Sequence, residues 1–180
     1  MGIEGEPKDY LGIHKSGIFE RLLPLYNTVL EYLPKVQKSK TILDVGCGVG
    51  MFTEVLFKSN YSDYVGIDFS PTVIEIAKKR VPEAKFIVAD LRDSETRKNF
   101  KQYSIFIMLE VLEHINDDLN VLKAIPSNSL VIFSVPSFDD PFHVRHFNSV
   151  NSVIKRYESL IKFNKSKTIG HRFLFSCIRH

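Results

Sequence analysis

The sequence predicts a doubly wound α/β fold, in which a mostly parallel, Rossmann-like sheet of seven strands ends in a C-terminal antiparallel hairpin. Between residues 41 and 136, short apolar segments alternate with helical segments, which is typical of a parallel sheet with helices on both faces. The first of these strands runs into a loop with a glycine at every second position. Two further strand-like segments flank Gly170 near the C-terminus and predict the hairpin.

The chain of 180 residues is long enough for one α/β domain with a buried core. We expect residues 1–180 to form a single domain, with an N-terminal flap and helix at 1–40 and a catalytic core at 41–180. The net charge of +3 does not indicate a nucleic-acid-binding arm. Two cysteines make no disulfide framework, and neither a membrane-spanning apolar segment nor a secretory signal occurs. These features favour a cytoplasmic protein.

The elements are expected in the following order. Apolar residues recur every three or four positions from 18 to 33, which predicts an amphipathic helix interrupted near Pro24. Residues 1–17 carry little periodicity and are interpreted as a flap, and 34–40 as a basic linker. The helix at 71–80 has the clearest start, because Ser70 can cap it and Pro71 suits its first turn. The other elements are strands at 41–45, 64–68, 85–89, 103–108 and 130–135, helices at 50–58 and 149–160, and hairpin strands at 161–168 and 172–178.

The glycine loop indicates a ligand site without phosphates. Gly46, Gly48 and Gly50 allow the backbone to approach a ligand closely, and Cys47 is a small residue that fits a tight turn. A phosphate-binding loop usually supplies a lysine, but no Lys or Arg occurs from residue 41 to 57. The loop therefore favours a nucleoside without phosphates over NAD or ATP.

Acidic residues stand at four successive strand ends on the expected ligand side: Asp44, Asp68, Asp90 and Glu110. Asp68 follows Gly50 by 18 positions, close to the spacing of about 20 expected for a carboxylate that binds ribose hydroxyls. Such a carboxylate accepts two charge-assisted hydrogen bonds from vicinal hydroxyls. One strand-end aspartate is often only a turn former. Four acids together favour an uncharged or cationic nucleoside cofactor.

The motifs resemble, in order, those of class I S-adenosylmethionine-dependent methyltransferases. They are Asp44-Val45-Gly46-Cys47-Gly48-Val49-Gly50, Asp68-Phe69-Ser70, Asp90-Leu91 and Glu110-Val111-Leu112-Glu113-His114. The resemblance covers residues 41–136 in register, and the terminal hairpin is similar to the reversed last strand of that family. It implies S-adenosyl-L-methionine as the cofactor and S-adenosyl-L-homocysteine as the product.

The resemblance also implies roles for single positions. The backbone at the three glycines would line the methionyl and ribose groups, Asp44 would hold the methionyl amine and Asp68 the ribose hydroxyls. Phe69 and Asp90 would contact the adenine, and Glu110 would lie near the sulfonium. The whole implied cofactor site consists of Asp44, Gly46, Cys47, Gly48, Gly50, Asp68, Phe69, Ser70, Asp90, Leu91, Glu110 and Val111.

Three histidines are candidates for the catalytic base. Methyl transfer needs an aligned acceptor and, for a hydroxyl acceptor, a group that removes its proton. Histidine suits this role near neutral pH. His114 follows the fourth strand, and His143 and His146 follow the fifth, so all three fall on the expected cofactor side. We therefore expect methylation of a small molecule at oxygen, with nitrogen as the alternative target atom.

Two other functions stay open. On a helix, Glu110, Glu113 and His114 would share one face and, with His143 or His146, hold a divalent ion. This set resembles that of small-RNA 3′-end 2′-O-methyltransferases, although the His-x-Phe-Glu-aromatic stretch of those enzymes is missing here, and we assign no metal ligand. The second alternative is a non-catalytic cofactor-binding protein of the same fold.

The sequence offers few segments for recognising an acceptor. Almost nothing is inserted between the fifth strand and the hairpin, and only about forty residues precede the first strand. Either the acceptor is small, or a homodimer or partner subunit completes its pocket. Basic residues between 155 and 179 are more typical of a solvated surface than of a nucleic-acid site.

Overall fold

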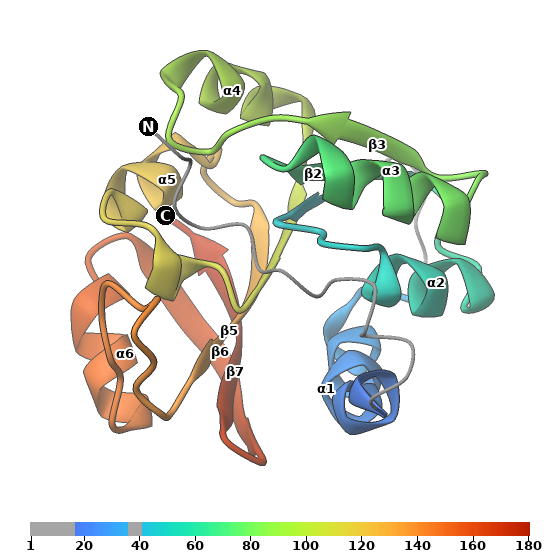
Figure 1. Cartoon of the computed structure of the whole chain (residues 1–180). Coiled ribbons are helices and arrows are strands. Elements are labelled where there is room, and N and C mark those ends of the chain that lie inside the picture. The colour runs from blue at the N-terminus through green and yellow to red at the C-terminus, as the bar shows by residue number, and fades with distance from the viewer. Residues whose placement is uncertain (1–16, 36–40) are drawn as a thin grey trace.

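Seven strands form one mixed sheet in the order β3-β2-β1-β4-β5-β7-β6. The computed structural model of the chain describes residues 17–35 and 41–180 (Figure 1). The first five strands are parallel, and the last two form the antiparallel hairpin that the sequence predicts. Their bounds are β1 Ile42–Val45, β2 Tyr64–Asp68, β3 Lys85–Val88, β4 Ile105–Leu109, β5 Leu130–Pro136, β6 Ile161–Ile169 and β7 Arg172–Arg179.

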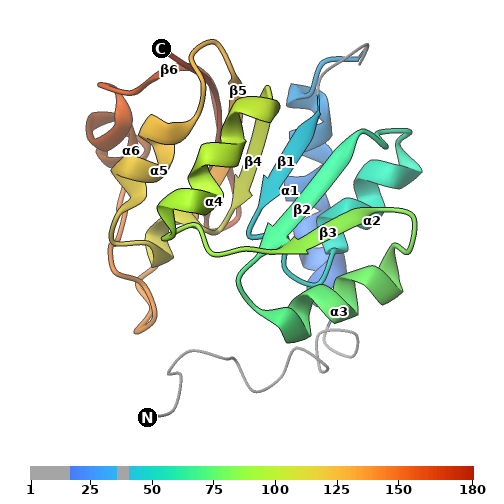
Figure 2. The same ribbon diagram turned by 90° about the horizontal axis from the view of Figure 1, so that it is seen from above.

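Helices cover both faces of the sheet (Figure 2). One face carries α1 (Ile18–Tyr32), α2 (Met51–Lys58) and α3 (Pro71–Arg80). The other carries α4 (Ser94–Lys98), α5 (Asp118–Ala124) and α6 (Val150–Tyr157). Two short 3₁₀ turns, η2 (Asn99–Gln102) and η3 (Leu112–His114), lead into and out of β4. Each face buries its own apolar cluster, so the predicted doubly wound fold class is confirmed.

The register of the parallel strands brings their carboxyl ends to one edge, which we call the ligand edge. Val45 is level with Ile67 of β2, and Ile67 is level with Ile87 of β3. Leu109 at the end of β4 is level with Ser134 near the end of β5. Loops that follow these strands therefore lie next to one another, as is usual for ligand sites of such sheets.

The helix α1 departs from the sequence prediction. It runs without interruption through Pro24, so the expected break is wrong. Proline removes one amide donor and crowds the carbonyl four residues earlier, which can bend a helix without ending it. Four residues later, the hydroxyl of Thr28 donates to the carbonyl oxygen of Pro24 at 2.9 Å. The helix also buries Leu25, Tyr26 and Val29 against the sheet, which holds it together across the proline.

Other predicted elements agree with the structure to within a few residues. The predicted flap at 1–17 and linker at 34–40 lie mostly outside the described residues. Among the described helices, none is both long and apolar enough to cross a membrane.

Candidate functional site

The glycine loop forms a tight turn at the end of β1. Gly46, Gly48 and Gly50 have φ angles of 71°, 56° and 76°, in the left-handed region that favours glycine. A Cβ at Gly46 would lie 2.6 Å from a methyl carbon of Val111, so the loop passes directly over the residue that follows Glu110. A Cβ at Gly48 would meet no atom of residues 17–35 and 41–180 within 4 Å.

Asp44 lies buried beneath this loop, with 3% of its surface exposed. The hydroxyl of Tyr64 donates to its Oδ2 at 2.8 Å, and Thr53 lies 2.7 Å from the same hydroxyl. Because the Tyr64 proton goes to Asp44, the Thr53 hydroxyl donates to Tyr64. Burial raises the pKa of Asp44 to about 7, although the hydrogen bond from Tyr64 opposes that shift. Sequence reasoning missed Tyr64, whose hydroxyl comes from the start of the neighbouring strand.

Asp68 ends β2 and holds the loop from the other side. Its Oδ2 accepts from the amide of Gly48 at 3.2 Å, and its Oδ1 from the amide of Ser70 at 3.0 Å. Burial raises the pKa of Asp68, and the backbone amides oppose this. The carboxylate is therefore fixed in orientation beside Gly48.

The residues predicted to contact adenine lie together at the ends of β2 and β3. Phe69 is 51% exposed, and the guanidinium of Arg92 lies 5.9 Å from its ring centroid. Arg92 also donates through Nε and Nη2 to the carboxylate of Asp90, which holds the pKa of Asp90 below its usual range. Leu91 is buried in the core, and its predicted contact would use the backbone amide.

Two predicted positions have clear structural roles. Ser70 accepts from the amide of Val73 and caps α3. Cys47 is buried with its sulfur next to Gly66, where a Cβ would lie 2.9 Å from Sγ. Burial raises the pKa of the Cys47 thiol, so it stays protonated.

Glu110 follows β4 with a φ of 57°, an uncommon conformation for a residue with a side chain. Its Oε1 accepts from the Ser134 hydroxyl at 2.6 Å, and its Oε2 lies 3.0 Å from Nε of Arg172. Burial raises the pKa of Glu110, and Ser134 and Arg172 oppose the shift. Ser134 and Arg172 are further site residues that sequence reasoning missed.

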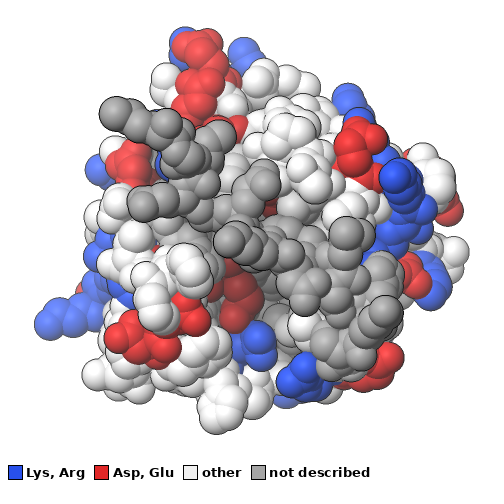
Figure 3. Space-filling view, in the orientation of Figure 1, with Lys and Arg blue, Asp and Glu red and all other residues white. Residues whose placement is uncertain are grey.

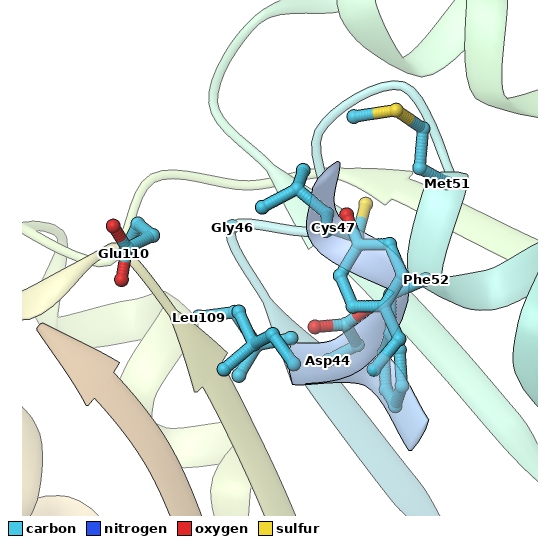
Figure 4. A pocket seen from close by; sticks show the side chains of 10 residues that line it. Asp44, Gly46, Cys47, Met51, Phe52, Leu109 and Glu110 are labelled. Atoms are coloured by element: carbon cyan, nitrogen blue, oxygen red, sulfur yellow. The ribbon is translucent and has the colours of Figure 1, made fainter. Parts of the chain in front are cut away.

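A cavity of about 290 Å³ connects these groups with helix α1. In Figure 4, Glu110 lies on one side, Met51, Cys47 and Phe52 on the other, and Asp44 and Leu109 between them. Figure 3 shows acidic and basic groups side by side in a hollow of this face. The remaining lining residues, Leu22, Leu25 and Tyr26, come from α1. The cavity is apolar along α1 and acidic along the strand ends.

Two of the three candidate histidines lie together. The rings of His114 and His143 have centroids 4.9 Å apart, and His114 Nδ1 lies 3.1 Å from the carbonyl oxygen of Phe142. The Nδ1 atom of His143 is buried and has no hydrogen-bond partner within the described part of the chain. His146 lies apart, with Nε2 3.4 Å from the carbonyl oxygen of Ser137.

Glu113 joins this histidine pair. Its side chain is 1% exposed, and neither carboxylate oxygen finds a hydrogen-bond donor among residues 17–35 and 41–180. Burial, and secondarily the charge of Glu110, raises the pKa of Glu113 to about 8. One potential ligand atom each from Glu113, His114 and His143 lies within 4.8 Å of the others.

The alternative metal set named from the sequence would need Glu110, Glu113 and His114 on one face of a helix. The segment is a 3₁₀ turn followed by extended backbone, not an α-helix. Glu110 consequently turns toward Ser134 and Arg172, away from the position that a shared helical face would give it.

Comparison with known proteins identifies the family. The sequence profile of a family described as "Methyltransferase domain" matches residues 17–174. The chain belongs to this methyltransferase family. The predicted family and fold class are therefore confirmed.

Several curated methyltransferases are similar in sequence. The Ubiquinone biosynthesis O-methyltransferase of Actinobacillus pleuropneumoniae serotype 7 (strain AP76) is 25% identical over 156 residues, covering 81% of this chain and 62% of the relative. The protein of the same name from Hydrogenovibrio crunogenus is 30% identical over 139 residues, covering 67% and 53%. The chain thus spans less than two thirds of the length of these methyltransferases.

Solved structures share the methyltransferase fold over nearly the whole chain. A protein from Pyrococcus horikoshii OT3 has a TM-score of 0.74 and 17% identity, with 98% of this chain and 100% of the other covered. A SAM-dependent methyltransferase from Aquifex aeolicus has a TM-score of 0.73 and 15% identity, covering 97% and 100%. A methyltransferase from Haloferax volcanii, solved in complex with the Trm112 activator, has a TM-score of 0.74 and 11% identity, covering 97% and 99%.

Proposed function

We propose that the chain binds S-adenosylmethionine and transfers its methyl group to an oxygen atom of a small molecule. The main support is the pair of carboxylates around the glycine loop. Asp44 lies buried below the loop and Asp68 is held beside it by two backbone amides. A methyl donor with a cationic sulfur and an ammonium group complements such a site, because a buried carboxylate needs a positive partner. Membership of the methyltransferase family supports the same proposal.

In this proposal, the residues have separate tasks. Asp44 pairs with the methionyl amine, and the free lone pairs of Asp68 accept from the ribose hydroxyls. The exposed ring of Phe69 packs against the adenine. Glu110 lies across the cavity from Cys47 and Phe52, where its charge stabilises the sulfonium (Figure 4). The cofactor itself supplies an activated methyl group and a neutral sulfide leaving group.

Histidine is the proposed base. The acceptor oxygen forms a bond to the methyl carbon while the carbon–sulfur bond breaks. The electron pair of the carbon–sulfur bond stays on sulfur. The acceptor proton moves to His143, whose buried Nδ1 has no partner among the described atoms. Alignment of the acceptor supplies the larger part of the rate, because proton removal is usually worth 10²–10⁴-fold.

The experiment is a transfer assay with tritiated S-adenosylmethionine, run against pools of phenolic, aliphatic hydroxyl and amine acceptors. Oxygen-linked methyl groups on a small molecule are the expected product. The names of the curated relatives support oxygen as the target atom. Binding of the cofactor without transfer to any of these pools, or to RNA in a parallel assay, would instead support a non-catalytic binding protein.

A second candidate function is metal-assisted methylation of an RNA 3′ end at the 2′-oxygen. The observation that favours it is the buried Glu113, which lies next to His114 and His143 and accepts no hydrogen bond from any described residue. A carboxylate with two imidazoles suits Mn²⁺, Fe²⁺ or Zn²⁺ better than Mg²⁺. Transfer to RNA that is lost in EDTA and restored by Mn²⁺ would establish this function. Unchanged transfer to a small molecule in EDTA would rule it out.

A further inference from the structure

A positively charged side chain, that of Arg172, forms an ion pair with Glu110, one of the residues that line the cavity. Arg172 is the first residue of β7 and is level with Pro136, the last residue of β5, so it lies at the ligand edge. Alternate residues of a strand point to the same face. Leu174 packs into the apolar cluster that α1 covers, and Arg172 therefore points to the α1 side, where the cavity lies.

The ion pair of Arg172 leaves much of its binding capacity unused. Its Nε lies 3.0 Å from Glu110 Oε2, but the N–H does not point well enough at any acceptor among the described residues to form a hydrogen bond. The side chain keeps 29% of its surface exposed. Guanidinium has five donors in a planar fork that fits a carboxylate in a bidentate manner. Glu110 contacts one edge of that fork, so donors remain for a ligand.

The residues around Arg172 are acidic, so an anionic ligand needs the positive charge of Arg172 in order to bind. Asp44 and Glu110 line the cavity, and Glu113 lies near Glu110. An anion entering such a site is repelled unless a cation receives it. The charge of Arg172 lowers the pKa values of Tyr26 on α1, Glu110 and Glu113, so it acts on all three of these groups.

We propose that Arg172 recognises a carboxylate of the methyl acceptor, so that the acceptor is a small hydroxy acid. This inference rests on the proposed methyl transfer. The carboxylate binds the free donors of Arg172, and the carbon skeleton lies along Leu22, Leu25 and Leu109. The hydroxyl then faces the cationic sulfur and His143. The cavity of about 290 Å³ must also admit the methionyl end of the cofactor at Asp44, so the space left for the acceptor suits a compact acid.

The experiment compares acids with their uncharged esters. Probes are 4-hydroxybenzoate, 3,4-dihydroxybenzoate and 3-hydroxybutyrate, each against its methyl ester, titrated into the S-adenosylhomocysteine-loaded protein. The acid is expected to bind at least tenfold more tightly than the ester in one or more pairs. Arg172→Met should abolish that preference, and Arg172→Lys should keep part of it. Lys167→Met is the matched control, since it removes one charge from the same hairpin at the contact with Thr28 of α1.

Two results would overturn the inference. One is the absence of any acid preference in all three pairs, including failure of every acid to bind. The other is a loss of S-adenosylhomocysteine affinity in Arg172→Met while Lys167→Met binds normally, which would assign Arg172 to the methionyl carboxylate of the cofactor. Cofactor binding is measured in the same samples without an acceptor. If the wild-type protein binds no S-adenosylhomocysteine in these samples, that result refutes the proposed function and not the anion site.

Discussion

The hydroxyl of Tyr64 on β2 donates a hydrogen bond of 2.8 Å to Oδ2 of Asp44 on β1. Among the described side chains, the Tyr64 hydroxyl is the one group that donates a hydrogen bond to this buried carboxylate. Burial outweighs it, so the pKa of Asp44 is raised to about 7. The charge of Asp44 consequently changes within the physiological pH range, with direct effects on cofactor binding.

Affinity for S-adenosylhomocysteine should rise with pH up to about 7. The methionyl ammonium pairs with ionised Asp44, but below the pKa of about 7 the side chain carries a proton that binding must release. We expect the affinity to rise by at most about tenfold per pH unit between pH 5 and 7 and then to level off. Calorimetric titrations across this range measure the effect. Asp44→Asn should remove the dependence, and an unchanged slope in that variant would contradict the assignment.

Replacing Tyr64 should shift this pH dependence. Tyr64→Phe removes the hydrogen bond that favours the ionised carboxylate, so the pKa of Asp44 moves further up and the affinity levels off at a higher pH. The same change leaves Thr53 without its partner, at a cost of about 1–3 kcal/mol in unfolding free energy. Urea unfolding and the pH series together test both effects. Tyr61→Phe is the control, because its hydroxyl contacts the Pro34 carbonyl away from the site.

Asp68→Ala should weaken S-adenosylhomocysteine binding by at least about 1.5–3 kcal/mol, the range for hydrogen bonds to a charged group. The variant removes the proposed ribose acceptor and also frees the amides of Gly48 and Ser70. Asp63→Ala provides a comparison with the same change in charge at an exposed position. Equal affinities of the two variants in calorimetry would remove Asp68 from the site.

Replacing two of the loop glycines with alanine should lower the free energy of unfolding by unequal amounts. The methyl group of Gly48→Ala meets no described atom within 4 Å, so its cost in unfolding free energy is the backbone penalty of about 1–2 kcal/mol. Gly46→Ala adds a methyl group 2.6 Å from the Val111 side chain, and its cost should be clearly larger. Urea unfolding measures both. Adding Val111→Ala should recover part of the Gly46→Ala loss, because it removes the clashing methyl.

His143→Ala should lower methyl transfer by about 10²–10⁴-fold while cofactor binding stays nearly intact. His146→Ala should have a much smaller effect, because its ring contacts the Ser137 carbonyl and does not belong to the His114–His143 pair. Single-turnover rates with saturating cofactor separate the two variants. Similar losses in both would mean that the base has been assigned to the wrong residue.

Local signals explain which elements could be predicted from the sequence. The helix α3 begins as expected, because Ser70 caps it and Pro71 occupies its first position, and it ends at the expected Arg80. The interruption expected at Pro24 fails, since burial of one side of α1 outweighs the missing amide. Alternation of strands and helices was sufficient to predict the sheet, but not the φ of 57° at Glu110, which depends on the packing around β4.

The candidate site was predictable where each residue follows its own strand. The acids at strand ends and the glycine loop do lie along the ligand edge. Contacts between segments that are distant in the chain cannot be predicted from local sequence patterns. Arg172 reaches Glu110 across 62 positions of the chain, and Tyr64 reaches Asp44 across the β1–β2 pair. His143 pairs with His114 and His146 contacts Ser137, and the loop that carries both has no periodic pattern that would predict this.

Hydrogen bonds to backbone carbonyl oxygens connect the segments that carry His114 and His143. The amide of Val144 donates to the carbonyl oxygen of Glu113 at 2.9 Å, and the Arg145 guanidinium donates to the carbonyl oxygen of Ile115 at 2.6 Å. Arg145 also lies 3.2 Å from the buried carboxylate of Asp118. Neither segment can shift without moving the other. New acceptor preferences would therefore arise more readily through changes in α1 or at the tip of the β6–β7 hairpin, where adaptation does not disturb the imidazoles.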